Sequence, residues 1–331
     1  KKINTIELPE NLTSIGDYCF FECTNLKEII LPRNLKNVSA KAFVNSAIEH
    51  IFIDVGNPYM TTENGSLFTK DKHKLICCPP YNKQFTLFEE TEEVGEAACQ
   101  GNCQIKTIKL TKNVMELGAN AFSGCKELRD IHFEGNKLEK VGDYCFYKCS
   151  KLKSAEFPGS VVHMGMFAFS ECYRLEKIDL PTQLTMMGEG VFNKCYSLNN
   201  VVMPVSIRKV PRGICAECYK LERVILAKGT TVIKHNAFAD CISLKEIVNT
   251  ENVELVENYI FGFCIKLKEP SFADNCMCVL DSDSSLLDFK MKNTTFLMYG
   301  YDKKKIGEGD QIHIKQIIDF AKYIEEYIAN N

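Results

Sequence analysis

The chain has 331 residues, of which 45% are hydrophobic and 25% are charged, and its formal net charge is −3. No apolar run reaches the length of about 18 residues that a membrane helix needs. The near balance of 40 basic and 43 acidic residues gives no overall field that would attract a phosphate backbone. We therefore expect neither a membrane span nor a nucleic-acid partner in this chain.

Most of the sequence repeats with a period of 23 residues, once 24. Most repeats contain an aliphatic residue followed by glycine, then Phe-x-x-Cys, then Leu-x-x-Ile-x-Leu or a close variant. The Phe-x-x-Cys pairs are Phe122/Cys125, Phe146/Cys149, Phe169/Cys172, Phe192/Cys195, Phe238/Cys241 and Phe261/Cys264. Repetition at this period is typical of a leucine-rich solenoid, in which neighbouring coils bury each other's apolar faces. The predicted fold is a β-rich α/β solenoid, a right-handed leucine-rich repeat superhelix of about ten coils.

In chain order, the solenoid is expected to occupy residues 1–272. The first residues, Lys1 to Pro9, already match the Leu-x-x-Ile-x-Leu-Pro part of a repeat, and without an initiator Met or signal peptide we interpret the chain as a fragment or a processed form. The period fails between 54 and 84, where Asn64-Gly65 and a second turn after Phe68 separate short apolar runs. These turns predict a β-hairpin insertion that projects from the stack.

Residues 273–331 lack the repeat and are predicted to form a C-terminal capping segment. The run 294–301 favours a strand, and 314–329 has its isoleucines on one side of a helix and charged residues on the other. A terminal coil has an open apolar end, and this strand and helix would cover it. Such a helix could instead bind a partner or a membrane surface, but acidic residues on its polar face disfavour the membrane.

Eight of the 17 cysteines occupy one repeat position: Cys23, Cys125, Cys149, Cys172, Cys195, Cys218, Cys241 and Cys264. Stacked coils lie about 4.8 Å apart with parallel side chains, whereas a disulfide needs converging Cβ atoms about 3.8 Å apart. These cysteines are therefore predicted to remain thiols and to pack as small hydrophobic residues. Cys77, Cys78, Cys276 and Cys278 lie outside the repeat, and as more exposed thiols they are better candidates for oxidation.

No pattern in the sequence indicates chemistry. The six histidines have no metal-ligand spacing, and the closely spaced cysteine pairs fall on core positions. There is no glycine-rich phosphate loop and no Gly-x-Ser-x-Gly motif. We expect no catalytic residues, no metal and no cofactor.

The Leu-x-x-Ile-x-Leu segments are expected to form short parallel strands, one in each coil. Alternation along a strand turns the Ile inward and its two neighbours outward. The predicted ligand-binding residues are the outward ones of four successive strands: Lys177, Asp179, Asn200, Val202, Arg223, Ile225, Glu246 and Val248. Val202, Ile225 and Val248 would form an exposed apolar row beside polar groups, which is typical of an interaction surface. The alternative is that β-branched residues simply suit a strand.

A column of aromatic residues follows the cysteine position, at Tyr173, Tyr196 and Tyr219. Stacked aromatic rings can form a platform for sugars or proteins. They can also pack against one another to cover the edge of the coils, and we favour this second interpretation.

The repeat resembles the BspA-like leucine-rich repeat family, which is found on surface proteins of gut and oral bacteria and of some mucosal protists. Residues 119–125 and 236–244 match the family's Ala-Phe-x-x-Cys-x-x-Leu pattern, 64–68 resembles its hairpin, and Tyr299-Gly300-Tyr301 resembles its closing segment. The resemblance covers nearly the whole chain and implies attachment to host matrix proteins, to cells or to other microbes.

The expected function is thus a non-catalytic protein-binding or adhesion module at the cell surface or outside the cell, acting as a monomer on a host matrix or cell-surface protein. An intracellular scaffold or regulatory module in the cytoplasm is the alternative, because the cytosol keeps cysteines reduced. A glycan-binding surface protein is a third possibility, although the chain has no Trp to build an aromatic platform.

Overall fold

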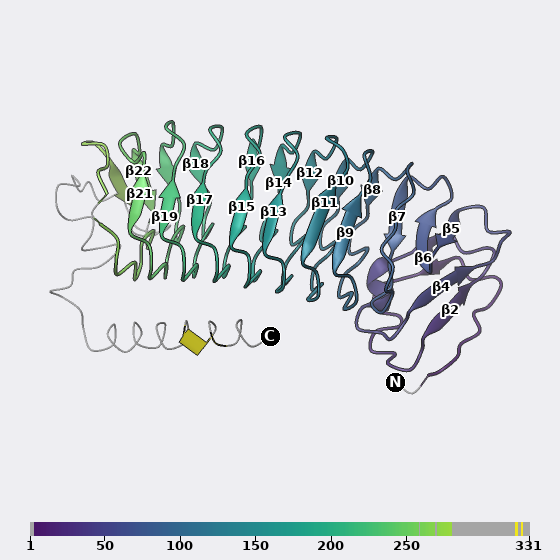
Figure 1. Cartoon of the computed structure of the whole chain (residues 1–331). Helices are drawn as coiled ribbons and strands as arrows, with labels where there is room; N and C mark the ends of the chain where they lie inside the picture. The colour runs from purple at the N-terminus through teal and green to yellow at the C-terminus, as the bar shows by residue number, and fades with distance from the viewer. Residues whose placement is uncertain (1–2, 258, 269, 280–321, 324–325, 327–331) are drawn as a thin grey trace. The chain divides into compact units, whose positions relative to one another are not determined.

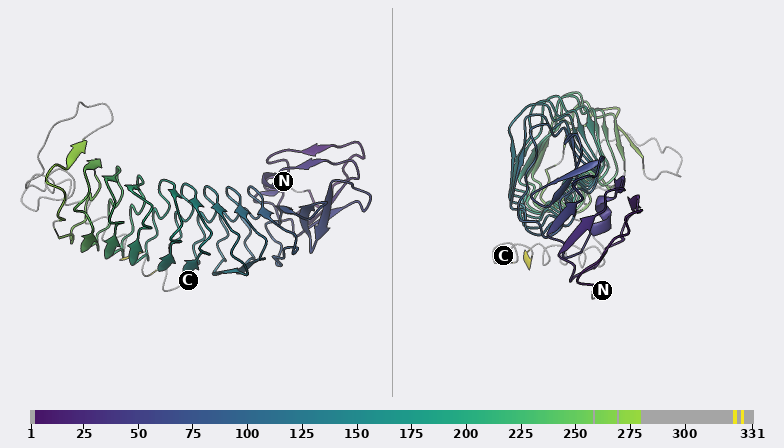
Figure 2. Two further views of the ribbon diagram at one scale, coloured as in Figure 1. Left: turned by 90° about the horizontal axis from the view of Figure 1, so that it is seen from above. Right: turned by 90° about the vertical axis from the view of Figure 1, so that its right-hand side faces the viewer.

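A computed structural model describes residues 3–257, 259–268, 270–279, 322–323 and 326. The chain forms two compact units: unit 1 consists of Lys1–Leu152 and Phe157–Ala168, and unit 2 of Lys153–Glu156 and Phe169–Asn331. The described residues make about 11 turns of about 23 residues, close to the ten expected, which confirms the leucine-rich solenoid. Figure 1 labels the strands along the chain, and Figure 2 shows successive coils of each unit following one another. The right-handed superhelix stays a prediction.

A typical coil contributes two short strands. The front strands contain the Ile of Leu-x-x-Ile-x-Leu, and the rear strands contain the aliphatic residue that usually precedes glycine. The front strands are β2 (Glu28–Leu31), β4 (His50–Ile53), β9 (Thr107–Leu110), β11 (Asp130–Phe133), β13 (Ser154–Glu156), β15 (Lys177–Asp179), β17 (Asn200–Val202), β19 (Arg223–Ile225) and β21 (Glu246–Val248). The rear strands are β1 (Ser14–Ile15), β3 (Asn37–Val38), β8 (Glu93–Val94), β10 (Glu116–Leu117), β12 (Lys140–Val141), β14 (His163–Met164), β16 (Met186–Met187), β18 (Lys209–Val210), β20 (Val232–Ile233), β22 (Leu255–Glu257) and β23 (Met277–Val279).

Strands of neighbouring coils pair in parallel. In unit 2, β13 pairs with β15, β17 with β19, and β19 with β21, while the rear strands form the order β18-β20-β22-β23. In unit 1, β2 pairs with β4, β9 with β11, and the rear strands β8, β10, β12 and β14 are consecutive neighbours. The register advances by one repeat per coil, so the same repeat position recurs along each row.

The core of each unit is built from residues that recur at one repeat position. Phe122 and Phe146 are fully buried and stack with ring centroids 5.5 Å apart, and Phe169 and Phe192 repeat the arrangement at 6.1 Å. The inward residues of the front strands are buried beside them. Each coil alone would leave this apolar side in water, so stacking supplies the hydrophobic stabilisation.

Turns replace the helices of an α/β repeat. Among the described residues up to 279, the only helix is the 3-10 helix η1 (Ala40–Phe43). Nearly every coil instead carries left-handed residues around its Phe position, for example Asn120 with φ 56° and Gly124 with φ 74°. A left-handed residue interrupts the repeated right-handed dihedrals that a helix needs, so each coil bends and returns to the next strand.

Glycine follows several rear strands because the backbones of neighbouring coils approach each other closely there. A Cβ atom on Gly118 would lie 2.6 Å from the backbone nitrogen of Glu96 and 2.7 Å from the carbonyl carbon of Gly95 in the neighbouring coil. Only glycine permits this approach of two backbones. In later coils the position holds other residues: Pro211 follows β18, and the coil continues without a break.

The insertion in unit 1 forms three antiparallel strands: β5 (Met60–Glu63), β6 (Ser66–Thr69) and β7 (Lys74–Cys77). The predicted Asn64-Gly65 turn is present, with both residues at positive φ. The expectation that the hairpin projects from the stack is wrong, because β7 pairs in parallel with β8 and the first three residues of β6 are buried.

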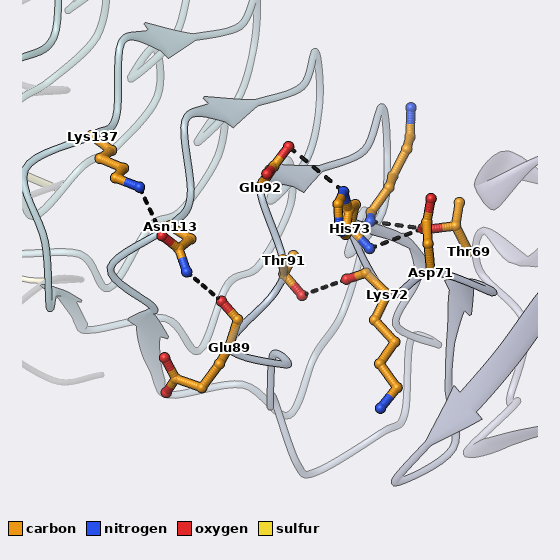
Figure 3. A network of polar contacts seen from close by, with 10 residues as sticks. Thr69, Asp71, Lys72, His73, Glu89, Thr91, Glu92, Asn113 and Lys137 are labelled. Atoms are coloured by element: carbon orange, nitrogen blue, oxygen red, sulfur yellow. Dashed lines mark hydrogen bonds and ion pairs between the residues drawn. The ribbon is translucent and has the colours of Figure 1, made fainter.

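The second turn of the insertion is held by its own polar side chains. The Thr69 hydroxyl donates to the Asp71 carboxylate at 2.6 Å, and the same carboxylate accepts from the backbone N–H of His73. Figure 3 shows this turn joined to the next coil, where the Thr91 hydroxyl donates to the carbonyl of Lys72 and His73 lies 3.8 Å from the Glu92 carboxylate. These contacts fix the insertion to the solenoid.

The end of the solenoid is described as far as residue 279. There β23 continues the parallel ladder of β22 beyond the predicted boundary at 272. The predicted strand 294–301 lies outside the described residues, as does the predicted helix 314–329 except for Lys322, Tyr323 and Glu326, which are helical. The predicted cap and its boundary therefore stay predictions. In the ranges that the structure describes, no helix combines the length and apolar character needed to cross a bilayer.

Candidate functional site

The eight predicted binding residues all lie on the front strands of unit 2. Along β15 and β17 the middle residue is buried and its two neighbours are exposed, so the alternation predicted from the sequence holds there. The buried residues of this row are Ile178, Val201, Val224 and Ile247. The parallel register aligns Asn200, Arg223 and Glu246 in one outward column. The front strands are visible in Figure 1, where β17, β19 and β21 follow one another. Their role as a binding surface stays a prediction.

The charged members of this surface are paired with each other. The Lys177 ammonium lies 2.6 Å from the Asp179 carboxylate on the same strand, and the Arg223 guanidinium lies 2.8 Å from the Glu246 carboxylate on the neighbouring strand. The hydrogen bond from Lys177 to Asp179 and the charge of that carboxylate raise the pKa of Lys177. All four groups are largely exposed, so water screens both pairs and a partner's charges can replace them.

The apolar row differs from the prediction in one respect. Val202 is 58% exposed, but Ile225 and Val248 are partly buried. Ile225 lies on the central strand of the β17-β19-β21 sheet, between Val202 and Val248, and side chains in adjacent strands about 4.8 Å apart cover one another. The exposed apolar centre instead includes Val205, 76% exposed in the turn after β17, which sequence reasoning missed.

A groove lies beside Val202, where the front sheet of unit 2 is interrupted. No ladder joins β15 to β17 among the described strands, and the backbone of the two coils is linked here by the Asn199 N–H to the carbonyl of Glu176 at 3.3 Å. The groove has a volume of about 590 Å³. Its lining residues are Glu176, Lys177, Ile178, Asp179, Leu180, Thr182, Asn199, Asn200, Val202, Met203, Pro204 and Val205. Four of the eight predicted residues are among them.

Tyr173, Tyr196 and Tyr219 form a column whose rings pack against one another, as the second interpretation of the sequence predicts. The ring centroids of Tyr173 and Tyr196 lie 4.9 Å apart, those of Tyr196 and Tyr219 lie 4.8 Å apart, and both ring pairs are within 5° of parallel. Tyr196 and Tyr219 are each only 6% exposed, and Ile242 packs against the same cluster. Burial raises the pKa of both phenols. Because the rings cover each other, Tyr196 has no face left for a sugar.

The eight cysteines that share one repeat position form a buried column, here called the cysteine column. Thiols of this column make a hydrogen bond to the backbone that the sequence did not reveal. The Cys195 thiol donates to the carbonyl of Phe169 at 3.2 Å, and Cys218 and Cys264 repeat the bond to Phe192 and Phe238 at 3.1 Å. Burial raises the pKa of these three thiols, which keeps them protonated as donors. The packing role predicted for this column is confirmed.

The expectation about the cysteines outside the repeat is wrong where it can be checked. Cys77, Cys78 and Cys276 are buried, because β7 lies within the sheet rather than on a projecting hairpin and Cys276 precedes a paired strand. Burial raises the pKa of Cys77. Hydrogen bonds from Cys99 and then from Ser66 and Asn102 lower the pKa of Cys78. The side chain of Cys278 lies outside the described residues. Over the described ranges, no cluster of three or more His, Cys, Asp or Glu side chains could hold a metal ion.

Unit 1 carries a second exposed apolar group that sequence reasoning missed. Ile30 and Phe52 are register partners on β2 and β4, with 67% and 43% of their surfaces exposed. The alternation in 28–31 and 50–53 already turns these two residues outward, so the period-two pattern could have identified them. They show that exposed apolar residues on the front strands are not restricted to unit 2.

The sequence matches a family model described as "BspA type Leucine rich repeat region", in six copies, over residues 1–86, 92–222 and 208–282. A comparison with curated proteins found no match. The structure is similar to a leucine-rich repeat protein from Bacteroides ovatus, with 20% identity, 81% of this chain and 78% of the other covered, and a TM-score of 0.55.

Two further solved structures have a TM-score of 0.50. The pneumococcal vaccine antigen PcpA is 21% identical, with 75% of this chain and 54% of the other covered. A leucine-rich repeat protein from Eubacterium ventriosum is 20% identical, with 84% and 63% covered. This chain thus spans about half of the PcpA chain, and at these identities the likeness concerns the fold alone.

Proposed function

Because the chain belongs to the BspA-type leucine-rich repeat family, we propose that it is a non-catalytic protein-binding and adhesion module displayed at the cell surface. Its partner is a host matrix protein or a cell-surface protein. The contact surface is the front face of unit 2, formed by the outward residues of β15, β17, β19 and β21. The observation that carries this proposal is the exposed apolar centre at Val202 and Val205 beside paired charges.

The composition of this surface suits a protein partner. Protein interfaces combine an apolar centre, which excludes water, with a polar rim that gives specificity. Val202 and Val205 supply the centre, and the Lys177–Asp179 and Arg223–Glu246 pairs supply the rim. Because the outward side chains stand on paired strands, little ordering accompanies binding, and this lowers the entropic cost of association.

The cysteines of the column support a scaffold role rather than a catalytic one. A thiol acts as a nucleophile only as the thiolate. Burial and the raised pKa values of Cys195, Cys218 and Cys264 oppose thiolate formation, and their thiols are engaged with backbone carbonyls. The column holds coils together and leaves binding to the outer face.

An intracellular scaffold is the second candidate. It is favoured by the 16 cysteines of the described part of the chain that are thiols rather than disulfides, since the cytosol keeps thiols reduced. Surface biotinylation of intact cells that produce the protein separates the two candidates. Labelling of the chain by a membrane-impermeant reagent supports surface display, and labelling only after lysis supports the scaffold.

Capture of solubilised extracellular-matrix and cell-surface proteins on the immobilised chain tests the proposed surface. The strand-face variant Arg223→Glu/Ile225→Asp changes one charge and one apolar group on β19. Its matched control, Lys209→Glu/Met186→Asp, makes the same two kinds of change on the rear strands of unit 2, where both side chains are exposed. We expect the native chain and the control to retain a protein partner that the folded strand-face variant loses.

Two outcomes contradict the proposal. Capture by the strand-face variant at the native level would move the contact elsewhere on the chain. Loss of capture in the control alone would place the contact on the rear strands. Circular dichroism and the melting temperature of each variant show beforehand that it is folded, so a loss of capture is not a loss of structure.

A further inference from the structure

The groove in the front face of unit 2 has two chemically different walls. One wall is β15 with its flanking residues, where Glu176 and Asp179 are exposed beside Lys177. Two carboxylates and one ammonium leave one net negative charge. Lys177 is held by Asp179 at 2.6 Å, and no described residue forms an ion pair with Glu176. On the adjacent coil, Glu156 is a further exposed carboxylate and Lys153 an exposed ammonium, so the net charge of this side stays at one negative. This wall is acidic.

The opposite wall is β17 and the turn that follows it. Val202 and Val205 are both well exposed, whereas Met203 and Pro204 between them are buried. Two exposed apolar side chains that line a hollow gain free energy when an occupant covers them. This wall offers hydrophobic burial and no charge.

The groove also holds polar groups that are free to bind a backbone. The exposed side chains of Asn199 and Asn200 make no hydrogen bond with another described residue. A carboxamide both donates and accepts hydrogen bonds, so it can satisfy the N–H and the C=O of a peptide. A segment whose backbone N–H and C=O groups are not already hydrogen-bonded therefore fits this groove better than a purely apolar molecule.

An extended peptide matches all three features. Its successive side chains point to opposite sides, so one set can face the acidic wall while the alternate set faces the apolar wall. We propose that this groove binds an extended segment of the partner protein in which basic residues alternate with aliphatic ones. This inference rests on the proposed function, because it names the chemistry of the partner at the same surface.

Fluorescence anisotropy with short labelled peptides tests the alternation. The probe is Lys-Ile-Lys-Ile-Lys, compared with Lys-Lys-Lys-Ile-Ile, which has the same composition without the alternation, and with the charge-reversed Glu-Ile-Glu-Ile-Glu. We expect the alternating lysine peptide to bind about tenfold more tightly than either comparison peptide, because only it can satisfy both walls at once. Equal affinity for the alternating and the block peptide would overturn the two-wall arrangement.

Charge reversal of the acidic wall tests the location. The variant Glu176→Lys/Asp179→Lys should weaken binding of the lysine peptide by about tenfold and strengthen binding of the glutamate peptide. Glu251→Lys/Glu254→Lys makes the same charge change at exposed positions of unit 2 that do not line the groove, and it should bind like the native chain. An equal effect of both double variants would show a general charge effect and overturn the inference.

The two proposals fail in different ways. If the strand-face variant loses a captured protein while the native chain shows no preference among the peptides, the binding surface stands and the peptide inference is wrong. If the peptides bind as expected while no protein is captured through this face, the groove chemistry stands and the proposed adhesion function is wrong.

Discussion

At the scale of single residues, the cysteine column links one coil to the next. The Phe169 carbonyl already accepts from the backbone N–H of Cys172 in its own turn, and the thiol of Cys195 from the following coil adds a second hydrogen bond. A carbonyl oxygen has two lone pairs, so one turn accepts both donors. Sulfur is large enough to reach this carbonyl while filling apolar space, which accounts for cysteine at this position.

Removal of one such thiol tests this account. We expect Cys195→Ala to lower the free energy of unfolding by about 2 kcal/mol, from the lost packing of sulfur and the lost hydrogen bond. Cys19→Ala is the control, because Cys19 is exposed, and its effect should stay within about 0.5 kcal/mol. Urea denaturation measures both. Equal effects of the two substitutions would contradict the role given to the column.

The buried thiols of the cysteine column should make the free energy of unfolding fall as the pH rises in the alkaline range. An unfolded thiol titrates near pH 8.5, whereas burial raises the pKa of Cys195, Cys218 and Cys264 in the folded chain. Above pH 8.5 the folded state therefore binds more protons than the unfolded state. The contribution of these thiols to the free energy of unfolding is complete below that pH and is lost as the pH rises.

Each such thiol should contribute a slope of about 1.4 kcal/mol per pH unit above that point. Urea denaturation between about pH 7.5 and 9.5 should show the stability of the native chain falling more steeply than that of Cys195→Ala. The same slope in both proteins would show that Cys195 does not stay protonated in the folded state.

At the scale of elements, the coil depends on a backbone approach at the glycine after the rear strand. Gly118 donates its N–H to the carbonyl of Val94, and its Cα lies against the backbone of Gly95 and Glu96. A Cβ atom on Gly16, at the equivalent position in the first coil, would meet no atom of the described residues within 4 Å. The same sequence motif thus has a steric role in one coil and none in the other.

A matched pair of substitutions separates the two cases. Gly118→Ala should lower the free energy of unfolding by about 2–3 kcal/mol, because the added methyl group overlaps backbone atoms that cannot move independently. Gly16→Ala should be neutral or raise it by up to about 1 kcal/mol, since alanine restricts the unfolded chain. Thermal and urea denaturation give both values, and a neutral Gly118→Ala would contradict the close approach.

The sequence predicted the elements better than their connections. The period-two pattern around Ile178 and Val201 places both residues in the core, yet it gives no sign that β15 and β17 do not pair, because both strands follow the same consensus. Asn64-Gly65 predicted its turn from local dihedral preferences. The pairing of β7 with β8 depends on contacts between distant residues, so the position of the insertion and the burial of Cys77 could not be read locally.

At the scale of the whole molecule, repetition explains both what the sequence reveals and what it conceals. Inward positions recur because each coil must pack on the next, so the solenoid could be predicted from the columns of Phe and Cys alone. Outward positions carry no packing constraint, and the residues there, such as Lys177, Asn200 and Arg223, vary from coil to coil. The eight predicted residues were placed on one face, but the groove and Val205 required the structure.

The most direct test of the binding surface is hydroxyl-radical footprinting of the chain, free and bound to solubilised extracellular-matrix proteins. Mass spectrometry then reports the oxidation of each exposed side chain. We predict that Val202, Val205 and Ile225 are oxidised less in the bound fraction, while Met186 on the rear strands, 60% exposed, is oxidised equally in both. Unchanged oxidation of Val202 and Val205 together with protection of Met186, or of Ile30 and Phe52 in unit 1, would contradict the assignment of binding to the front face of unit 2.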